Sequence, residues 1–236
     1  MAEANIDFAA IPQTAIRVVT KPAAFFKEMP KAGGFVEPLI FAAVMGVVAG
    51  IIYAVAGILG IGYMSAGIGS SLLMIIYMPI GAVIGGFIIA AIIFVIWKLM
   101  GSQENYETAY RCTAYLMSLT PIFAVLGLIP YAGGVINAAI YVYYIVIVSV
   151  QVHNLPSKKA WLVFGIIGLI FALLTVRAEY SARNMSSAAE QWRKAGEETA
   201  KAMEKSSREM QKQAEEIAKQ LQKQADEARK QAERNK

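Results

Sequence analysis

The chain has little of what enzymes and metalloproteins use. It contains one Cys and one His among 236 residues. A single Cys excludes an internal disulfide and a cysteine-based metal cluster. A lone His cannot form a metal site or a catalytic triad by itself. Phosphate-loop and His-Glu-x-x-His motifs are also missing. The sequence therefore predicts no catalytic residue, no metal and no cofactor.

Charged residues are also scarce, and long segments of the chain contain none. Only 17% of the residues are charged, and residues 38–97 and 112–157 contain no Asp, Glu, Lys or Arg. A membrane-spanning helix needs about 20 apolar residues. The sequence predicts an all-α integral membrane bundle with five spans, at residues 35–61, 72–98, 112–129, 135–152 and 160–176. Residues 101–111 are predicted to form a polar loop.

The domain organisation follows from these spans. Residues 1–34 form a cytoplasmic or interfacial segment, residues 35–176 the membrane domain, and residues 177–236 a charged tail. A short helix is predicted after Pro22, with Phe25, Phe26 and Met29 on one face. This face fits either the membrane surface or an ordinary amphipathic lead-in to the first span.

Basic residues predict the orientation. They precede the first span and occupy the second and fourth connections, whereas the first and third connections have none. Cytoplasmic loops carry an excess of Lys and Arg. The N-terminus is therefore predicted in the cytoplasm and the tail on the opposite side. If the fifth span re-enters instead of crossing, the tail is cytoplasmic.

Two faces of small residues are candidates for helix packing. The first contains Gly46, Gly50 and Gly57, and the second contains Gly81, Gly85 and Gly86. Small residues let helix backbones approach closely in a membrane. The faces fit packing between the first two spans, packing between subunits, or simply the frequent use of Gly in spanning helices.

The tail is rich in strong helix formers and contains no Pro. Its apolar residues follow a heptad seam with one stutter, at Met203, Met210, Ala214, Ile217, Leu221, Ala225 and Ala228. One interpretation is a coiled-coil bundle in a homo-oligomer. A second is a lone helix stabilised by pairs such as Glu204–Arg208. A third is a segment that is disordered or lies on the lipid surface.

A polar group lies before and within the third span, with a lone His farther along. It contains Tyr106, Glu107, Tyr110, Arg111 and Tyr115 at helical spacing, and His153 in a later connection. Glu107 and Arg111 are predicted to pair one turn apart. The group fits an aromatic and basic membrane anchor, or a cytoplasmic docking or gating surface. His153 fits an interfacial residue or a pH sensor.

Several of these residues, in this order, resemble bacterial members of the Yip family, the Ypt/Rab-interacting membrane proteins. The residues that carry the resemblance are Pro22, Phe25, Phe26, Met29, Gly101, Tyr106, Tyr110, Arg111, Tyr115, Pro121, Pro130, Gly133, Gly134 and His153. The resemblance covers residues 17–176 and implies five spans, with the N-terminus in the cytoplasm and the C-terminus on the opposite side. The predicted location is the bacterial inner membrane. Eukaryotic relatives bind prenylated Rab GTPases, a partner that bacteria lack. The tail departs from the family pattern.

The function predicted from these features is that of a non-enzymatic membrane scaffold. Its expected partners are the lipid bilayer, further copies of the chain, and a protein bound through the C-terminal helix. Nucleic acid is excluded, because the net charge of +5 does not gather on an aromatic patch. The alternatives are an oligomeric channel or passive transporter lined by Tyr, Ser and Asn137, and a lipid-handling protein.

Overall fold

The computed structural model describes residues 8–61 and 67–234, and these ranges contain helices and no strand. Five segments are long and apolar enough to cross a membrane: Val36–Ile58, Ile68–Met100, Tyr106–Leu126, Ala132–Gln151 and Ser157–Ala182. The predicted all-α membrane bundle with five spans is therefore confirmed.

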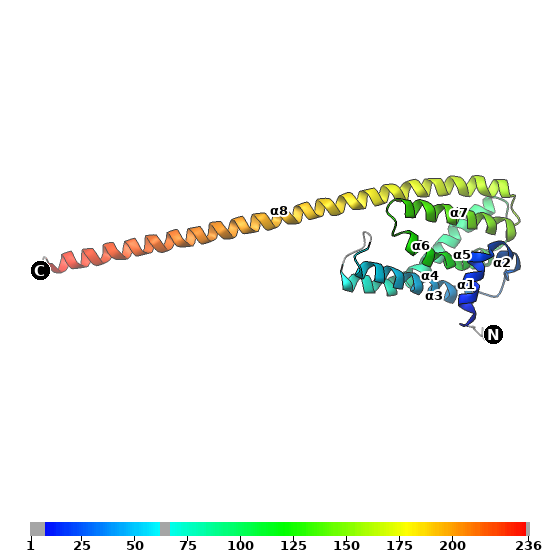
Figure 1. Ribbon diagram of the computed structural model, residues 1–236, viewed down its shortest axis with the longest axis horizontal. Coiled ribbons are helices and arrows are strands. Elements are labelled where there is room, and N and C mark those ends of the chain that lie inside the picture. The colour runs from blue at the N-terminus through cyan, green and yellow to red at the C-terminus, as the bar shows by residue number, and fades with distance from the viewer. Residues whose placement is uncertain (1–7, 62–66, 235–236) are drawn as a thin grey trace. The chain divides into compact units, whose positions relative to one another are not determined.

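The helices follow one another in a simple order. They are α1 (Ala10–Thr20), α2 (Pro22–Glu28), α3 (Val36–Ile58), α4 (Ile68–Leu99), α5 (Tyr106–Leu116), the 3₁₀ turn η1 (Met117–Leu119), α6 (Thr120–Leu126), α7 (Ala132–Gln151) and α8 (Ser157–Arg234). In Figure 1, α3 lies beside α4, and α7 lies beside the first part of α8. The chain forms two compact units, which meet between Tyr180 and Ser181 within α8.

Two glycines let α3 and α4 pack backbone to backbone. A Cβ added at Gly46 would lie 2.7 Å from the Cα of Pro79, and one added at Gly50 would lie 2.6 Å from the carbonyl oxygen of Met74. Both distances are shorter than real Cβ contacts, so any larger residue forces the helices apart. Gly57, on the same predicted face, is also buried in α3.

The second predicted small-residue face is divided between two environments. An added Cβ at Gly81 or Gly85 would meet no described atom within 4 Å. On the neighbouring face, Ala82 lies next to Gly46, and Gly86 faces the side chain of Met117. Ala82 and Gly86 therefore make the internal contacts, whereas Gly81 and Gly85 do not.

The third span begins earlier than predicted. Residues 106–111 are helical and not part of a loop, because Asn105 caps α5 by accepting a hydrogen bond from the amide of Thr108 at 2.9 Å. The span then breaks at η1 before α6, whose first turn contains Pro121. The Ser118 hydroxyl donates to the carbonyl of Tyr115 at 2.7 Å near this break. The Thr120 hydroxyl donates to the carbonyl of Met117 at 2.8 Å, which Pro121 cannot reach because it has no amide hydrogen.

The N-terminal helices pack into the bundle. Val18 and Phe26 are almost completely buried, and the Phe25 ring lies 5.1 Å from the Tyr115 ring. The Tyr144 hydroxyl, from α7, donates to the carbonyl of Val19 at 2.6 Å. The apolar face predicted near Phe25 therefore packs against protein, and not against the membrane surface.

The second unit is the charged continuation of α8. Glu204 and Arg208 form the predicted pair at 2.6 Å, and Trp192 and Met203 are exposed. The side chains of the other predicted seam residues, Met210, Ala214, Ile217, Leu221, Ala225 and Ala228, lie outside the described residues.

Candidate functional site

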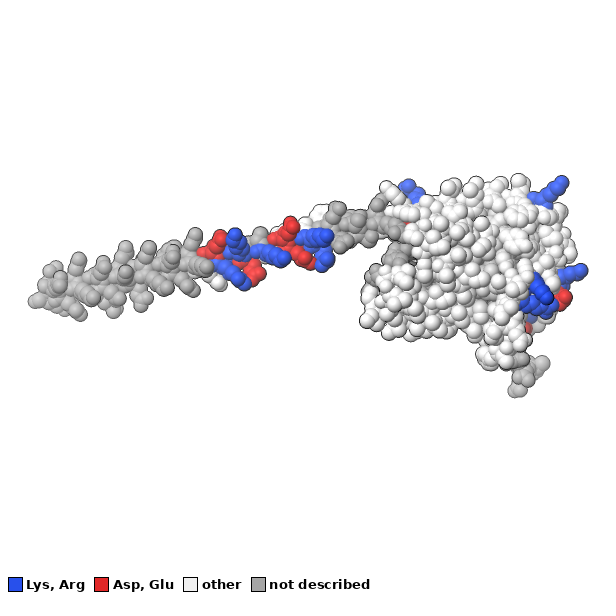
Figure 2. All heavy atoms as spheres, viewed as in Figure 1, with Lys and Arg blue, Asp and Glu red and all other residues white. Residues whose placement is uncertain are grey.

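Most of the described charged side chains of the first unit lie at one end of the bundle, whereas Arg177 and Glu179 lie farther along α8. This is the end where α3, α5 and α8 begin and where α4 and α7 end. Figure 2 shows blue and red atoms there on a bundle that is otherwise mostly white. The described charged residues that precede α3 or lie near these helix ends are Arg17, Lys21, Lys27, Glu28, Lys31, Glu37, Lys98, Glu104, Glu107, Arg111, Lys158 and Lys159.

Arg111 holds the segment that leads into α3. Its side chain is 1% exposed. Its Nε donates to the carbonyl of Pro30 at 2.8 Å, its Nη1 to the carbonyl of Gly34 at 3.0 Å, and its Nη2 to Glu37 Oε2 at 3.0 Å. The Tyr115 hydroxyl donates to the other Glu37 oxygen at 3.1 Å. One buried guanidinium therefore joins α5 to the start of the first span.

The predicted pair between Glu107 and Arg111 is wrong. Glu107 Oε1 instead accepts a hydrogen bond from the amide of Gly34 at 2.6 Å, and Arg111 pairs with Glu37. Both partners come from the segment before and at the start of α3. Glu107 binds the amide of Gly34 and Arg111 binds the carboxylate of Glu37, so the two side chains fix this segment at two different residues.

The predicted tyrosines lie mostly inside the bundle. Tyr110 stacks on Phe87 with ring centroids 4.2 Å apart, and the Tyr106 hydroxyl donates to the carbonyl of Phe87 at 3.0 Å. Tyr115 also contacts the Phe41 ring at 5.1 Å. Tyr110, Arg111, Tyr115 and His153 are buried, whereas Tyr106 and Glu107 are partly exposed. The docking or gating role stays a prediction, and the buried side chains could serve it only by supporting the exposed ones.

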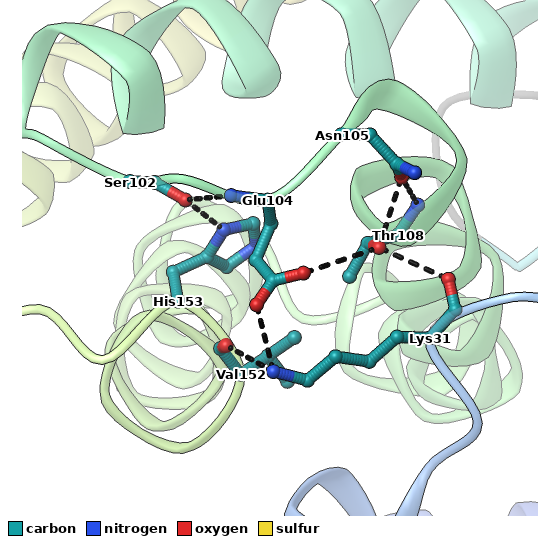
Figure 3. A network of polar contacts seen from close by, with 7 residues as sticks. All are labelled: Lys31, Ser102, Glu104, Asn105, Thr108, Val152 and His153. Atoms are coloured by element: carbon teal, nitrogen blue, oxygen red, sulfur yellow. Dashed lines mark hydrogen bonds and ion pairs between the residues drawn. The ribbon is translucent and has the colours of Figure 1, made fainter.

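A polar network joins three connections at this end (Figure 3). The Lys31 ammonium lies 2.7 Å from Glu104 Oε1 and donates to the carbonyl of Val152 at 3.1 Å. Ser102 Oγ accepts from the amide of Glu104 at 3.2 Å and lies 2.7 Å from His153 Nδ1. The segment before α3, the α4–α5 connection and the α7–α8 connection are therefore tied together.

His153 is held in an apolar and cationic environment. Its ring stacks on Trp97 with centroids 3.8 Å apart, and Trp97 Nε1 donates to Ser149 Oγ at 2.8 Å. His153 Nε2 is buried and has no hydrogen-bond partner among the described residues. Burial, and then the charges of Lys31 and Lys98, lower the pKa of His153 to about 3. The ring is therefore neutral near neutral pH.

Comparison with known families decides what kind of bundle this is. The family model described as the Yip1 domain matches residues 16–178, which is more than half of the chain. The chain belongs to the Yip1 domain family. The comparison with curated proteins found no match, and neither did the comparison with solved structures.

Some of the residues that carry the Yip resemblance lie close together in the structure. The lead-in to α3, which carries Phe25, packs on Tyr115, and Arg111 binds the carbonyl of Pro30 next to Met29. The family match ends at residue 178, so the charged part of α8 lies beyond the Yip1 domain. These contacts join the lead-in to the third span.

Several residues of this end are not predicted as site residues by the sequence pattern. They are Lys31, Glu37, Trp97, Ser102 and Glu104. Their partners lie 51 to 121 residues away in the chain. One local signal is present, because Asn is a typical N-cap residue and Asn105 directly precedes α5.

The described parts of the Yip1 domain contain no group of side chains that could bind a metal ion. No cluster of three or more His, Cys, Asp or Glu side chains occurs there. Cys112 is fully buried within α5. Asn137, predicted to line a pore, donates to the carbonyl of Phe123 at 3.0 Å and so ties α7 to α6.

Acid should destabilise the bundle through His153. The folded-state pKa is lower than the usual 6.5, so the unfolded chain binds the proton more readily as the pH falls below 6.5. The stability present above that pH is lost progressively towards pH 3, by about 2 kcal/mol between pH 6.5 and pH 5. Thermal unfolding in detergent at pH 7 to 5 measures this loss.

The matched variant for this prediction is His153→Gln, which retains a polar group beside Ser102 but cannot titrate. Its unfolding temperature should depend less on pH than that of the wild type over the same range. Equal pH dependence of the two proteins would contradict the assignment of the effect to His153.

Proposed function

We propose that this multi-pass membrane protein is a non-enzymatic scaffold that self-associates and organises the membrane or partner proteins. In this proposal the Yip1 domain anchors each copy in the bilayer. The charged part of α8 bundles with the same segment of other copies, or binds a protein partner. The tail's heptad seam is the sequence feature that motivates this division of labour.

The main observation in favour is the continuity of α8 from a membrane span into a charged helix. The helix runs over Ser157–Arg234, and the exposed Trp192 and Met203 lie in its charged part. Anchoring in a membrane raises the effective concentration of such helices, so a thin apolar seam can suffice for association. The second supporting observation is that the described carboxylates at the charged end, together with Arg111 and Lys31, form hydrogen bonds and ion pairs within the bundle.

The proposal includes an orientation and a location. We place the N-terminus in the cytoplasm and the tail across the bacterial inner membrane, because the basic connections alternate with uncharged ones. A membrane-impermeant maleimide should label a Ser206→Cys variant in cells with a permeabilised outer membrane and an intact inner membrane. Labelling only after the inner membrane is opened would place the tail in the cytoplasm. Cys112 is buried and should not interfere.

The test of self-association is the mass of the protein in mild detergent, measured by light scattering. The full chain should be an oligomer, and a chain ending at Ala182 should dissociate. Replacing Met210 and Ile217 together with Gln should raise the dissociation constant by about tenfold or more, because two apolar contacts per chain are lost.

The matched control replaces Ala195 and Ala202 with Gln, which adds the same side chain away from the seam. Its dissociation constant should stay within about twofold of the wild type. The proposal would be contradicted if the full chain had the mass of a monomer, or if truncation left the mass of the oligomer unchanged apart from the residues removed. Solute flux through liposomes containing the full chain would favour the channel alternative instead.

A further inference from the structure

The end of α4 and the start of α8 meet in a junction that carries three lysines. The Lys159 ammonium donates to the carbonyl of Met100 at 2.8 Å, which joins the two helix ends. Behind this contact, the rings of Trp97 and Phe164 lie 6.4 Å apart. Lys98 lies in the last turn of α4 and Lys158 in the first turn of α8. We call Lys98, Lys158 and Lys159 the junction lysines.

The carboxylates at this end are engaged elsewhere. Glu28 pairs with Arg17, Glu37 with Arg111, and Glu104 with Lys31. Glu107 accepts the amide of Gly34. Among the side chains that the structure describes, no carboxylate forms an ion pair with a junction lysine. The junction therefore keeps a surplus of positive charge at the predicted cytoplasmic boundary.

Exposed apolar side chains lie next to these lysines along both helices. Leu99, beside Lys98, is 82% exposed, and Leu162, one turn after Lys158, is 66% exposed. The exposed apolar surface continues into the spans through Val95 on α4 and Ile166 on α8. Trp161 is also exposed at the start of α8, as is common for Trp at the headgroup level of a membrane.

We propose that the junction lysines bind the headgroup of an anionic phospholipid whose acyl chains lie along α4 and α8. A phospholipid matches the surface because it combines a negative phosphate with hydrocarbon chains. An acidic protein segment would match the lysines but not the exposed leucines. Flexible ammonium groups suit a headgroup because they can follow it as point charges. Each lysine near an anionic membrane surface contributes about 1 kcal/mol, a fivefold change in binding.

The test uses the full-length protein in detergent with equal amounts of phosphatidylglycerol and phosphatidylcholine, and native mass spectrometry to count the lipids retained. The wild type should retain phosphatidylglycerol in preference. The double variant Lys98→Gln with Lys158→Gln should lower that preference by about twentyfold. The double variant Lys98→Arg with Lys158→Arg keeps the charge and should preserve most of the preference.

The matched control changes two other exposed lysines of the same end, Lys21→Gln with Lys27→Gln. It lowers the charge equally and should leave the preference within about twofold of the wild type. Equal loss in the control would overturn the assignment to the junction. Equal retention of both lipids by the wild type would overturn it as well, as would displacement of phosphatidylglycerol by a soluble polyglutamate peptide.

Discussion

Arg111→Gln should lower the free energy of unfolding by about 3 kcal/mol, the largest loss expected from any charge among the described side chains. The variant removes the guanidinium that binds the carbonyls of Pro30 and Gly34 and the carboxylate of Glu37. The two carbonyls would lose their donors, while Glu37 is half-exposed and stays hydrated. Unfolding in mixed micelles, followed by circular dichroism, measures the change.

The matched control is Arg17→Gln, which removes an exposed ion pair with Glu28 at the same end of the bundle. Exposed pairs are worth about 0–1 kcal/mol, so this variant should unfold almost like the wild type. Arg111→Lys should be intermediate, because an ammonium cannot reach three separated acceptors in the plane of a guanidinium. Similar losses of unfolding free energy for the Arg17 and Arg111 variants would contradict the stabilising role of the Arg111 contacts.

Gly50→Val should separate α3 from α4 and destabilise the bundle by about 3 kcal/mol. An added Cβ would lie 2.6 Å from the carbonyl oxygen of Met74 and 3.0 Å from the Cα of Ile75. These are backbone atoms, so no side-chain rotation can relieve the contact. The same unfolding assay applies.

Gly85→Val is the matched control, because its added Cβ would meet no described atom within 4 Å. Its free energy of unfolding should change by about 0.5 kcal/mol or less. A large loss at Gly85 without any loss at Gly50 would show that the second small-residue face carries the packing, for instance between copies of the chain.

The spans could be predicted because their signal is local. A helix in lipid must be apolar over its own length, so the charge-free blocks predict the spans directly. Contacts between spans are not local. The pair of Arg111 with Glu37 joins residues 74 positions apart, and only the nearer Glu107 could be proposed from helical spacing.

The glycine faces show the same limit. The spacing that placed Gly46 and Gly50 together also placed Gly81 and Gly85 together, since both pairs are four residues apart. Which pair meets another helix depends on the rotation of α4, and α4 is apolar on all sides. A helix without a polar face contains no sequence signal for that rotation.

The contacts of Arg111 also bear on how the protein is synthesised. The third span carries both Glu107 and Arg111 in its first two turns, and an Arg costs about 2.5–3.5 kcal/mol at the centre of an inserting helix. Pro30, Gly34 and Glu37 leave the ribosome more than seventy residues before Arg111 does. The acceptors are therefore already at the membrane when the third span arrives. We therefore expect the third span to insert less efficiently when the first span has not entered before it.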